Sequence, residues 1–126
     1  MQIDSVATAD APQAIGPYSQ GLKANGLLFT SGQIPLDPGT GNLVEGSFED
    51  QVHRVFRNME AILTAGGSDF SRVVKATVYL TDLGNFQAMN AIYAGYFGSH
   101  KPARTTVEVS ALPKGAQLEI DLIALA

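Results

Sequence analysis

Pro102-Ala-Arg-Thr-Thr-Val-Glu-Val-Ser-Ala-Leu-Pro-Lys-Gly-Ala-Gln-Leu-Glu-Ile-Asp121 is the stretch of this sequence that decides the fold. It contains two runs with the composition of β-strands, Arg104–Ala111 and Gln117–Leu125. The first is rich in β-branched residues, and the second begins with strict alternation of apolar and polar residues. The pattern alone favours pairing them as a hairpin, but Pro113 and Gly115 between them also permit a longer connection.

Each of these runs has a polar face, because side chains alternate between the two faces of a strand. Arg104, Thr106 and Glu108 share one face of the first run, and Glu119 and Asp121 share one face of the second. A guanidinium offers a carboxylate two parallel donors, and a nearby glutamate can move protons. The pattern indicates a pocket for a small organic acid. The alternative is a solvated face on which Arg104 pairs with Glu108 or Asp121.

Composition predicts one globular domain, residues 1–126. Hydrophobic residues make up 45% of the chain and charged residues 16%, which is typical of a folded protein. The 8 Lys and Arg against 12 Asp and Glu give a net charge of −4, which argues against a nucleic-acid surface. There is no cysteine, so disulfides and thiolate metal sites are excluded. No run is long and apolar enough for a membrane span, and Met1–Pro12 lacks the apolar centre of a secretion signal, so a cytoplasmic location is expected.

Patterns elsewhere in the chain predict four further strands and two helices. The strands are expected at Ile3–Thr8, Ser19–Ala24, Leu27–Gln33 and Val73–Leu80. Asn25-Gly26 predicts a type I′ hairpin turn, because both residues tolerate positive φ. In the last of these strands one face is predicted to carry Val74, Ala76, Val78 and Leu80, and the other Val73, Lys75, Thr77 and Tyr79.

The first helix is predicted to begin after Ser47, which forms a capping box with Asp50. One stripe of it is apolar, and Gly66-Gly67 ends it as residues that tolerate a left-handed backbone. The second helix is predicted from about Asn85 to Phe97. This order of elements predicts an α+β fold with both helices on one face of a sheet.

Several motifs in one order resemble the RidA (YjgF) family of reactive-intermediate imine/enamine deaminases. They cover almost the whole chain: Ile15-Gly-Pro-Tyr-Ser-Gln-Gly21, Thr30-Ser-Gly-Gln-Ile-Pro35, Val78-Tyr-Leu-Thr-Asp-Leu83, Met89-Asn-Ala-Ile-Tyr93 and the Pro-Ala-Arg stretch quoted above. The resemblance implies a chorismate-mutase-like fold, a mixed six-stranded sheet with the last strand between the Leu27 and Val73 strands.

The same resemblance implies a homotrimer with three sites in the clefts between subunits. Two helices can cover only one face of the sheet. The uncovered face is expected to meet other copies of the chain and to carry Thr77, Tyr79, Thr106 and Glu119.

The resemblance also implies roles for individual residues. Arg104 matches the carboxylate-binding arginine, and Glu119 matches a glutamate that positions or activates water; an ion pair of Glu119 with Lys75 or Lys114 is the alternative. Thr106 stands where many relatives carry cysteine, so thiol chemistry is irrelevant here, although its hydroxyl can still donate to a substrate or hold a water.

Four more residues match site positions of the family. Tyr18 is implied to come from the neighbouring subunit, and Asn90 occupies a position where the family has an asparagine in its site. The main chain of Ser31 and Gly32 is implied to form part of the pocket floor. Lys101 stands where many relatives carry an aromatic residue, which predicts a more open or more polar rim. His53 and His100 have no second histidine at ligand spacing, so no metal is expected, and the resemblance implies no cofactor.

The resemblance therefore implies a 2-iminobutanoate/2-iminopropanoate deaminase that hydrolyses intermediates such as 2-aminoacrylate to 2-oxo acids and ammonia. A non-catalytic trimer that binds small carboxylates is one alternative. A chaperone or a translation-inhibitor type of protein is another, and the acidic charge argues against an RNA-binding version of it.

Overall fold

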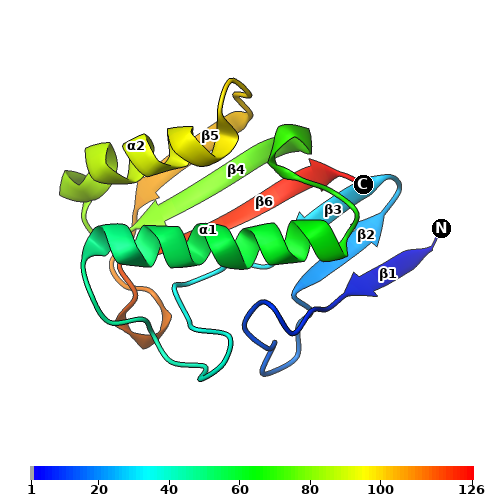
Figure 1. Cartoon of the computed structure of the whole chain (residues 1–126), viewed down its shortest axis with the longest axis horizontal. Coiled ribbons are helices and arrows are strands. Elements are labelled where there is room, and N and C mark those ends of the chain that lie inside the picture. The colour runs from blue at the N-terminus through cyan, green and yellow to red at the C-terminus, as the bar shows by residue number, and fades with distance from the viewer. Residues whose placement is uncertain (1) are drawn as a thin grey trace.

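Residues 2–126 are described in the computed structural model, in which one six-stranded mixed sheet carries two helices on one face (Figure 1). The strands follow the order β1-β2-β3-β6-β4-β5. Only β4 and β5 run parallel to each other, and the other neighbours are antiparallel. The strands are β1 (Ile3–Val6), β2 (Gly21–Ala24), β3 (Leu27–Thr30), β4 (Val73–Leu80), β5 (Ala103–Glu108) and β6 (Leu118–Leu125). The helices are α1 (Phe48–Ala65) and α2 (Phe86–Phe97).

β6 lies between β3 and β4, as the family resemblance predicts. The alternative, in which the last two strands pair as a hairpin, is wrong. The connection from β5 to β6 crosses the end of β4. Val109 N–H donates to the carbonyl of Leu80 over 2.8 Å, and Thr81 N–H donates to the carbonyl of Gln117 over 3.2 Å. β5 and β6 therefore lie on opposite sides of β4.

The observed strands are shorter than the predicted ones where the chain leaves the sheet. β3 ends at Thr30, and the ladder to β6 resumes only at Gln33, whose N–H donates to the carbonyl of Ile120 over 2.8 Å. Ser31 and Gly32 therefore depart from the sheet at this end of β6. A short 3-10 turn, Leu83–Asn85, precedes α2.

The predicted hairpin turn and helix start are confirmed, and the predicted helix end is confirmed in part. Asn25 and Gly26 adopt φ of 53° and 78° between β2 and β3, as a type I′ turn requires. Ser47 and Asp50 form both bonds of the capping box. At the other end of α1 the prediction was right only for Gly67, with φ of 80°, because Gly66 keeps a right-handed conformation at −85°.

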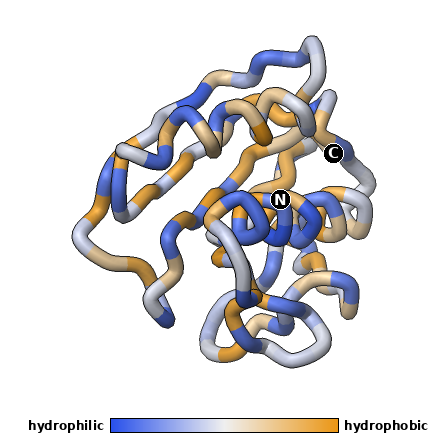
Figure 2. Tube along the Cα trace, turned by 60° about the vertical axis from the view of Figure 1, so that its left-hand side comes forward, coloured by the Kyte–Doolittle hydropathy of each residue, from blue (hydrophilic) through white to orange (hydrophobic). Residues whose placement is uncertain are grey.

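The core lies between the helices and the inner face of the sheet, and apolar and polar residues alternate along the strands (Figure 2). The predicted alternation of β4 was wrong at its start: Val73 is fully buried and Val74 is 41% exposed. A register shift between Val73 and Lys75 against β6 explains this, because one extra residue reverses the faces. From Ala76 onward the alternation is as predicted.

The register of the sheet places the polar side chains of β5 and β6 on opposite faces. Arg104 aligns with Ala76 and Thr106 with Val78, two fully buried residues of β4, so both belong to the face that carries the helices. Glu119 aligns with Tyr79 on the other face. The prediction that Thr106 shares the uncovered face with Glu119 was therefore wrong, because Thr106 and Glu119 align with adjacent residues of β4, Val78 and Tyr79, which point to opposite faces.

No helix in the described part of the chain has the length and apolar character needed to cross a bilayer. The uncovered face of the sheet nevertheless carries large apolar side chains. Leu22, Phe29 and Val107 are 40%, 41% and 37% exposed there.

Candidate functional site

Arg104 is held by neutral groups of α2. Its Nη1 donates to Asn90 Oδ1 over 2.6 Å. Its Cζ lies 4.7 Å from the centre of the Tyr93 ring and 5.5 Å from that of Phe86, within the range of cation–π attraction. These partners orient the guanidinium without neutralising its charge.

The sequence left open an ion pair of Arg104 with Glu108 or Asp121, but both carboxylates have other partners. Glu108 accepts from the N–H of Leu83 over 2.9 Å, and Asp121 accepts from the hydroxyl of Tyr79 over 3.2 Å. Asp121 also belongs to the opposite face from Arg104. The charge of Arg104 thus remains available to an anion.

A hollow of about 420 Å³ lies beside Arg104. Asn90, Tyr93, His100 and Lys101 are among its lining residues, and none of the residues that line it is acidic. His100 is held by contact of its Nε2 with the carbonyl of Val73 at 2.6 Å. The exposed Lys101 lines this hollow with Arg104 and gives it a second cation.

Two buried hydroxyls on the same side of the sheet have no hydrogen-bond partner among residues 2–126, those of Thr106 and Tyr93. Burial raises the pKa of the Tyr93 phenol, while the nearby Arg104 acts in the opposite direction. Buried polar groups are normally paired. The Tyr93 hydroxyl lies close to the Arg104 guanidinium, whereas the Thr106 hydroxyl has no polar partner within residues 2–126, and its donor role stays a prediction.

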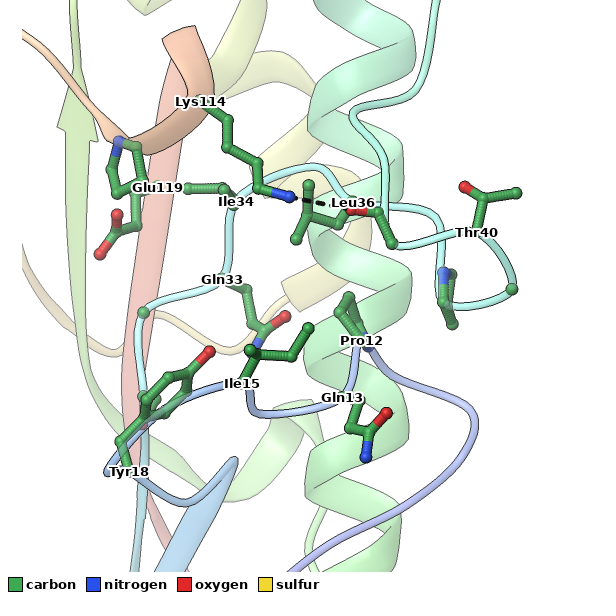
Figure 3. A pocket seen from close by; sticks show the side chains of 16 residues that line it. Pro12, Gln13, Ile15, Tyr18, Gln33, Ile34, Leu36, Thr40, Lys114 and Glu119 are labelled. Atoms are coloured by element: carbon green, nitrogen blue, oxygen red, sulfur yellow. Dashed lines mark hydrogen bonds between the residues drawn. The ribbon is translucent and has the colours of Figure 1, made fainter.

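Glu119 belongs to a second pocket, of about 760 Å³, at the end of β6 (Figure 3). Tyr18, Ser31 and Gly32 line the same pocket. A Cβ at Gly32 would overlap the Glu119 carboxylate and lie 2.7 Å from its Cδ. Glycine at this position thus allows the 31–32 backbone to pass directly beside the carboxylate.

Burial is the main cause that raises the pKa of the Glu119 carboxyl, and the neighbouring Asp121 raises it further. The two lysines considered as ion-pair partners donate elsewhere. Lys75 donates to Thr105 Oγ1 over 2.8 Å, and Lys114 donates to the carbonyl of Gly41 over 3.2 Å. In Figure 3 the Lys114 amine reaches away from Glu119. Glu119 therefore has the environment of a proton-holding carboxyl and not that of a surface ion pair.

Gln20 does not line this pocket but holds the loop beside it, and sequence reasoning missed this structural role. Its buried amide donates to the carbonyls of Ala11 and Pro12 over 3.3 and 2.7 Å, and its Oε1 accepts from Thr8 N–H over 2.7 Å. These bonds hold the loop that carries Tyr18 against the sheet. The only signal in the sequence was an amide inside the Tyr-Ser-Gln-Gly motif, which does not reveal burial.

Ser31 is tied to the same loop by its side chain and its main chain. Its Oγ donates to the carbonyl of Ser19 over 2.6 Å, and its N–H donates to that of Gln20 over 2.9 Å. Tyr18 is 53% exposed and lies in the Glu119 pocket of its own chain.

The predicted site residues thus form two groups in one chain. Arg104, Asn90 and Thr106 lie on the helix side, and Tyr18, Ser31, Gly32 and Glu119 lie in the pocket at the end of β6. Within residues 2–126 no three histidine or acidic side chains gather in a way that could hold a metal ion. The absence of a metal or cofactor from the function stays a prediction.

The fold defines the class: an α+β protein with a mixed six-stranded sheet and two helices on one face, with an arginine site and a carboxyl site. Residues 8–126 match the family model described as Endoribonuclease L-PSP. The chain belongs to that family, the RidA (YjgF) family, as its motifs indicate.

Named relatives include two deaminases. The chain is 52% identical to the chloroplastic Reactive Intermediate Deaminase A of Arabidopsis thaliana, over 94% of this chain and 64% of that protein. It is 46% identical to human 2-iminobutanoate/2-iminopropanoate deaminase, over 95% and 88% of the two chains. The crystal structure of Escherichia coli TdcF with bound serine superposes with a TM-score of 0.92 at 40% identity and 98% coverage of both chains.

Proposed function

We propose that this protein is an imine/enamine deaminase that converts 2-imino acids, such as those formed from 2-aminoacrylate, to 2-oxo acids and ammonia. The observation that carries the proposal is the state of Arg104: a charged guanidinium held by Asn90 and Tyr93, beside a hollow with no acidic lining residue. Such a group suits a substrate carboxylate. The deaminase relatives and the serine held by TdcF support a small amino-acid-like ligand.

Glu119 is assigned to the proton transfers. Imine hydrolysis needs a base to activate water and an acid to protonate the leaving nitrogen, and a carboxyl with a raised pKa can serve as both. Gly32 keeps the backbone close to this carboxyl, and Tyr18 stands in the same pocket.

Arg104 and Glu119 belong to opposite faces of one sheet, so a site containing both needs two copies of the chain. We therefore propose a homotrimer in which Arg104, Asn90 and Thr106 of one subunit face Tyr18, Ser31, Gly32 and Glu119 of the next. The large apolar side chains exposed on the uncovered face support burial there in an oligomer. Head-to-tail contacts of this kind form a closed ring of identical subunits when the rotation between neighbours closes.

The proposed reaction begins with the substrate carboxylate on Arg104. An enamine substrate first gains a proton at its terminal carbon and loses one from its nitrogen, which gives the imine. Water then adds to the C=N carbon: its oxygen forms the new bond, Glu119 takes one proton, and the nitrogen gains one. Glu119 then gives its proton to the carbinolamine nitrogen, the C–N bond breaks and ammonia leaves, and the carbinol oxygen forms the C=O bond of the 2-oxo acid as its proton passes to solvent. The Thr106 hydroxyl can hold the water or bind the substrate.

A non-catalytic trimer that binds small carboxylates is the second candidate, because the Arg104 pocket alone accounts for anion binding. Ammonia release from enzymatically generated 2-aminoacrylate separates the two functions. The deaminase proposal expects release well above the rate without protein. Binding of a 2-oxo acid without accelerated release would instead establish the binding function.

The composite site has its own test. Arg104→Ala and Glu119→Gln variants are each expected to be nearly inactive alone. After the two are mixed, unfolded and refolded together, random trimers should recover about one quarter of the wild-type activity, because one subunit contact in four joins two intact halves. Light scattering should give a trimer for both variants. A monomer, or a mixture as inactive as its parts, would contradict the composite site.

A further inference from the structure

Asp121 and Tyr79 form a second layer of polar groups behind Glu119 on the uncovered face of the sheet. Tyr79 lies directly opposite Glu119 in the β4–β6 pairing, and its hydroxyl donates to Asp121 Oδ2 over 3.2 Å. Asp121 is two residues from Glu119 on the same strand, so both carboxyls point to the same side. All three side chains are partly buried.

We propose that Asp121, held as an anion by Tyr79, is a positioning residue that keeps the exchangeable proton of this acidic pair on Glu119. This inference deepens the proposed deaminase function and rests on it for its catalytic meaning. Asp121 does not line the pocket that Glu119 lines, so its effect on a bound substrate passes through Glu119.

The surroundings of the two carboxyls decide which of them keeps the proton. Three groups of β4 favour the charged form of Asp121: the Tyr79 hydroxyl, Thr77 directly opposite it, and the Lys75 ammonium. Burial opposes them and raises the pKa of Asp121 overall. For Glu119 both resolved causes, burial and the charge of Asp121, raise the pKa. When two close carboxyls share one proton, it resides on the one whose anion is less stabilised, which here is Glu119.

Other charged groups near Glu119 do not change this order within the chain. Lys114 lines the same pocket, but its amine donates to the carbonyl of Gly41. Lys75 of β4 donates to Thr105 of β5, and β5 lies on the other side of β4 from Asp121. In the proposed trimer, Arg104 of a neighbour would approach Glu119 and lower its pKa. The fixed charge of Asp121 opposes that effect and lets Glu119 keep a proton for the leaving nitrogen.

The experiment is a pH titration of the Glu119 side-chain carboxyl, followed by ¹³C NMR in the full-length protein. Asp121→Asn removes the like charge, so the Glu119 titration should move to lower pH. Tyr79→Phe removes a donor from Asp121, so the Asp121 signal should begin to titrate together with that of Glu119. Asp4→Asn is the matched control: it removes the same charge from an exposed position on β1 and should leave Glu119 unchanged.

The activity readout is the pH profile of kcat for ammonia release. In Asp121→Asn the limb that reports Glu119 should move to lower pH, while KM stays near the wild-type value because the Arg104 anchor is intact. A Glu119 titration that is unchanged or moves upward in Asp121→Asn would overturn the inference. If that variant does not fold, an Asp121 signal unaffected by Tyr79→Phe would do the same. If the NMR shifts occur but no deaminase activity is found, the acidic pair stands and the proposed function fails.

Discussion

The surroundings of Arg104 and Glu119 differ in how they treat the charge of the side chain. Arg104 lies on edge strand β5, and its charge is oriented by an amide and two aromatic rings that leave it unneutralised. Glu119 lies on a central strand, and burial with a neighbouring carboxylate makes its charge unfavourable. The surroundings of Arg104 suit an anion, and the surroundings of Glu119 disfavour an ionised carboxyl.

The difference explains why the two regions are apart in one chain. An arginine and a glutamate side by side would pair, and the pairing would lower the pKa of the glutamate and occupy the guanidinium. The sheet keeps them on opposite faces, so each keeps its own state within one chain, and in the proposed trimer they meet only across two copies. Variants that change one region but not the other therefore test the comparison directly.

The largest effect is expected at Arg104. Arg104→Ala removes the carboxylate anchor and should be close to inactive. Arg104→Lys keeps the charge but loses the two parallel donors, and a displacement of the substrate by about 1 Å costs roughly 100-fold in rate. Ammonia release and a melting curve for each variant check both expectations. A lysine variant with nearly wild-type turnover would refute the geometric role, and an alanine variant that does not fold would make Arg104 structural.

Glu119→Gln should slow turnover by on the order of 10²–10⁴-fold, the usual contribution of acid–base assistance. Because the substitution leaves Arg104 intact, the variant should still bind a 2-oxo acid. Calorimetric titration with pyruvate, alongside the turnover assay, separates the two properties. Unchanged turnover would remove Glu119 from the chemistry.

Asn90→Ala should reduce kcat/KM by about tenfold, because a hydrogen bond to a charged group contributes on the order of 1.5 kcal/mol or more. Tyr93→Phe is the matched control in the same layer. It keeps the ring under the guanidinium and removes a hydroxyl that has no partner within residues 2–126, so it should stay within about threefold of the wild type. A larger loss in Tyr93→Phe than in Asn90→Ala would mean that the phenol binds the substrate.

The smallest effect is on stability. In the Arg104→Ala background, which removes the guanidinium of a neighbour, adding Glu119→Gln should raise the melting temperature slightly at pH 8. The raised pKa of Glu119 means that ionisation is less favourable in the folded state, so the cost grows as pH rises through that pKa. At a pH below the ordinary carboxyl pKa, Glu119 is protonated in both the folded and the unfolded state, so the difference in melting temperature between the two variants should vanish. Melting curves from pH 4 to pH 8 measure it, and a constant difference would contradict the burial argument.

Local chemistry in the sequence determined the turn, the helix start and most strand positions. Asn25-Gly26 and the Ser47 capping box act within four residues, so neighbouring residues alone specify them. The motifs quoted from the sequence also sufficed to identify the family and to single out some of the residues that line the pockets: Tyr18, Ser31, Gly32 and Glu119 in one, Asn90 and Arg104 in the other.

Only the tertiary structure decided how these parts face one another. The registers of β5 and β6 with β4, and not the order of the strands, put Thr106 and Glu119 on opposite faces. The bulge at the start of β4, the contact of Gly32 with Glu119 and the buried amide of Gln20 also join residues far apart in the chain. Side-chain alternation gives the two faces of a strand but not which face meets the core, since that depends on the register with a distant strand.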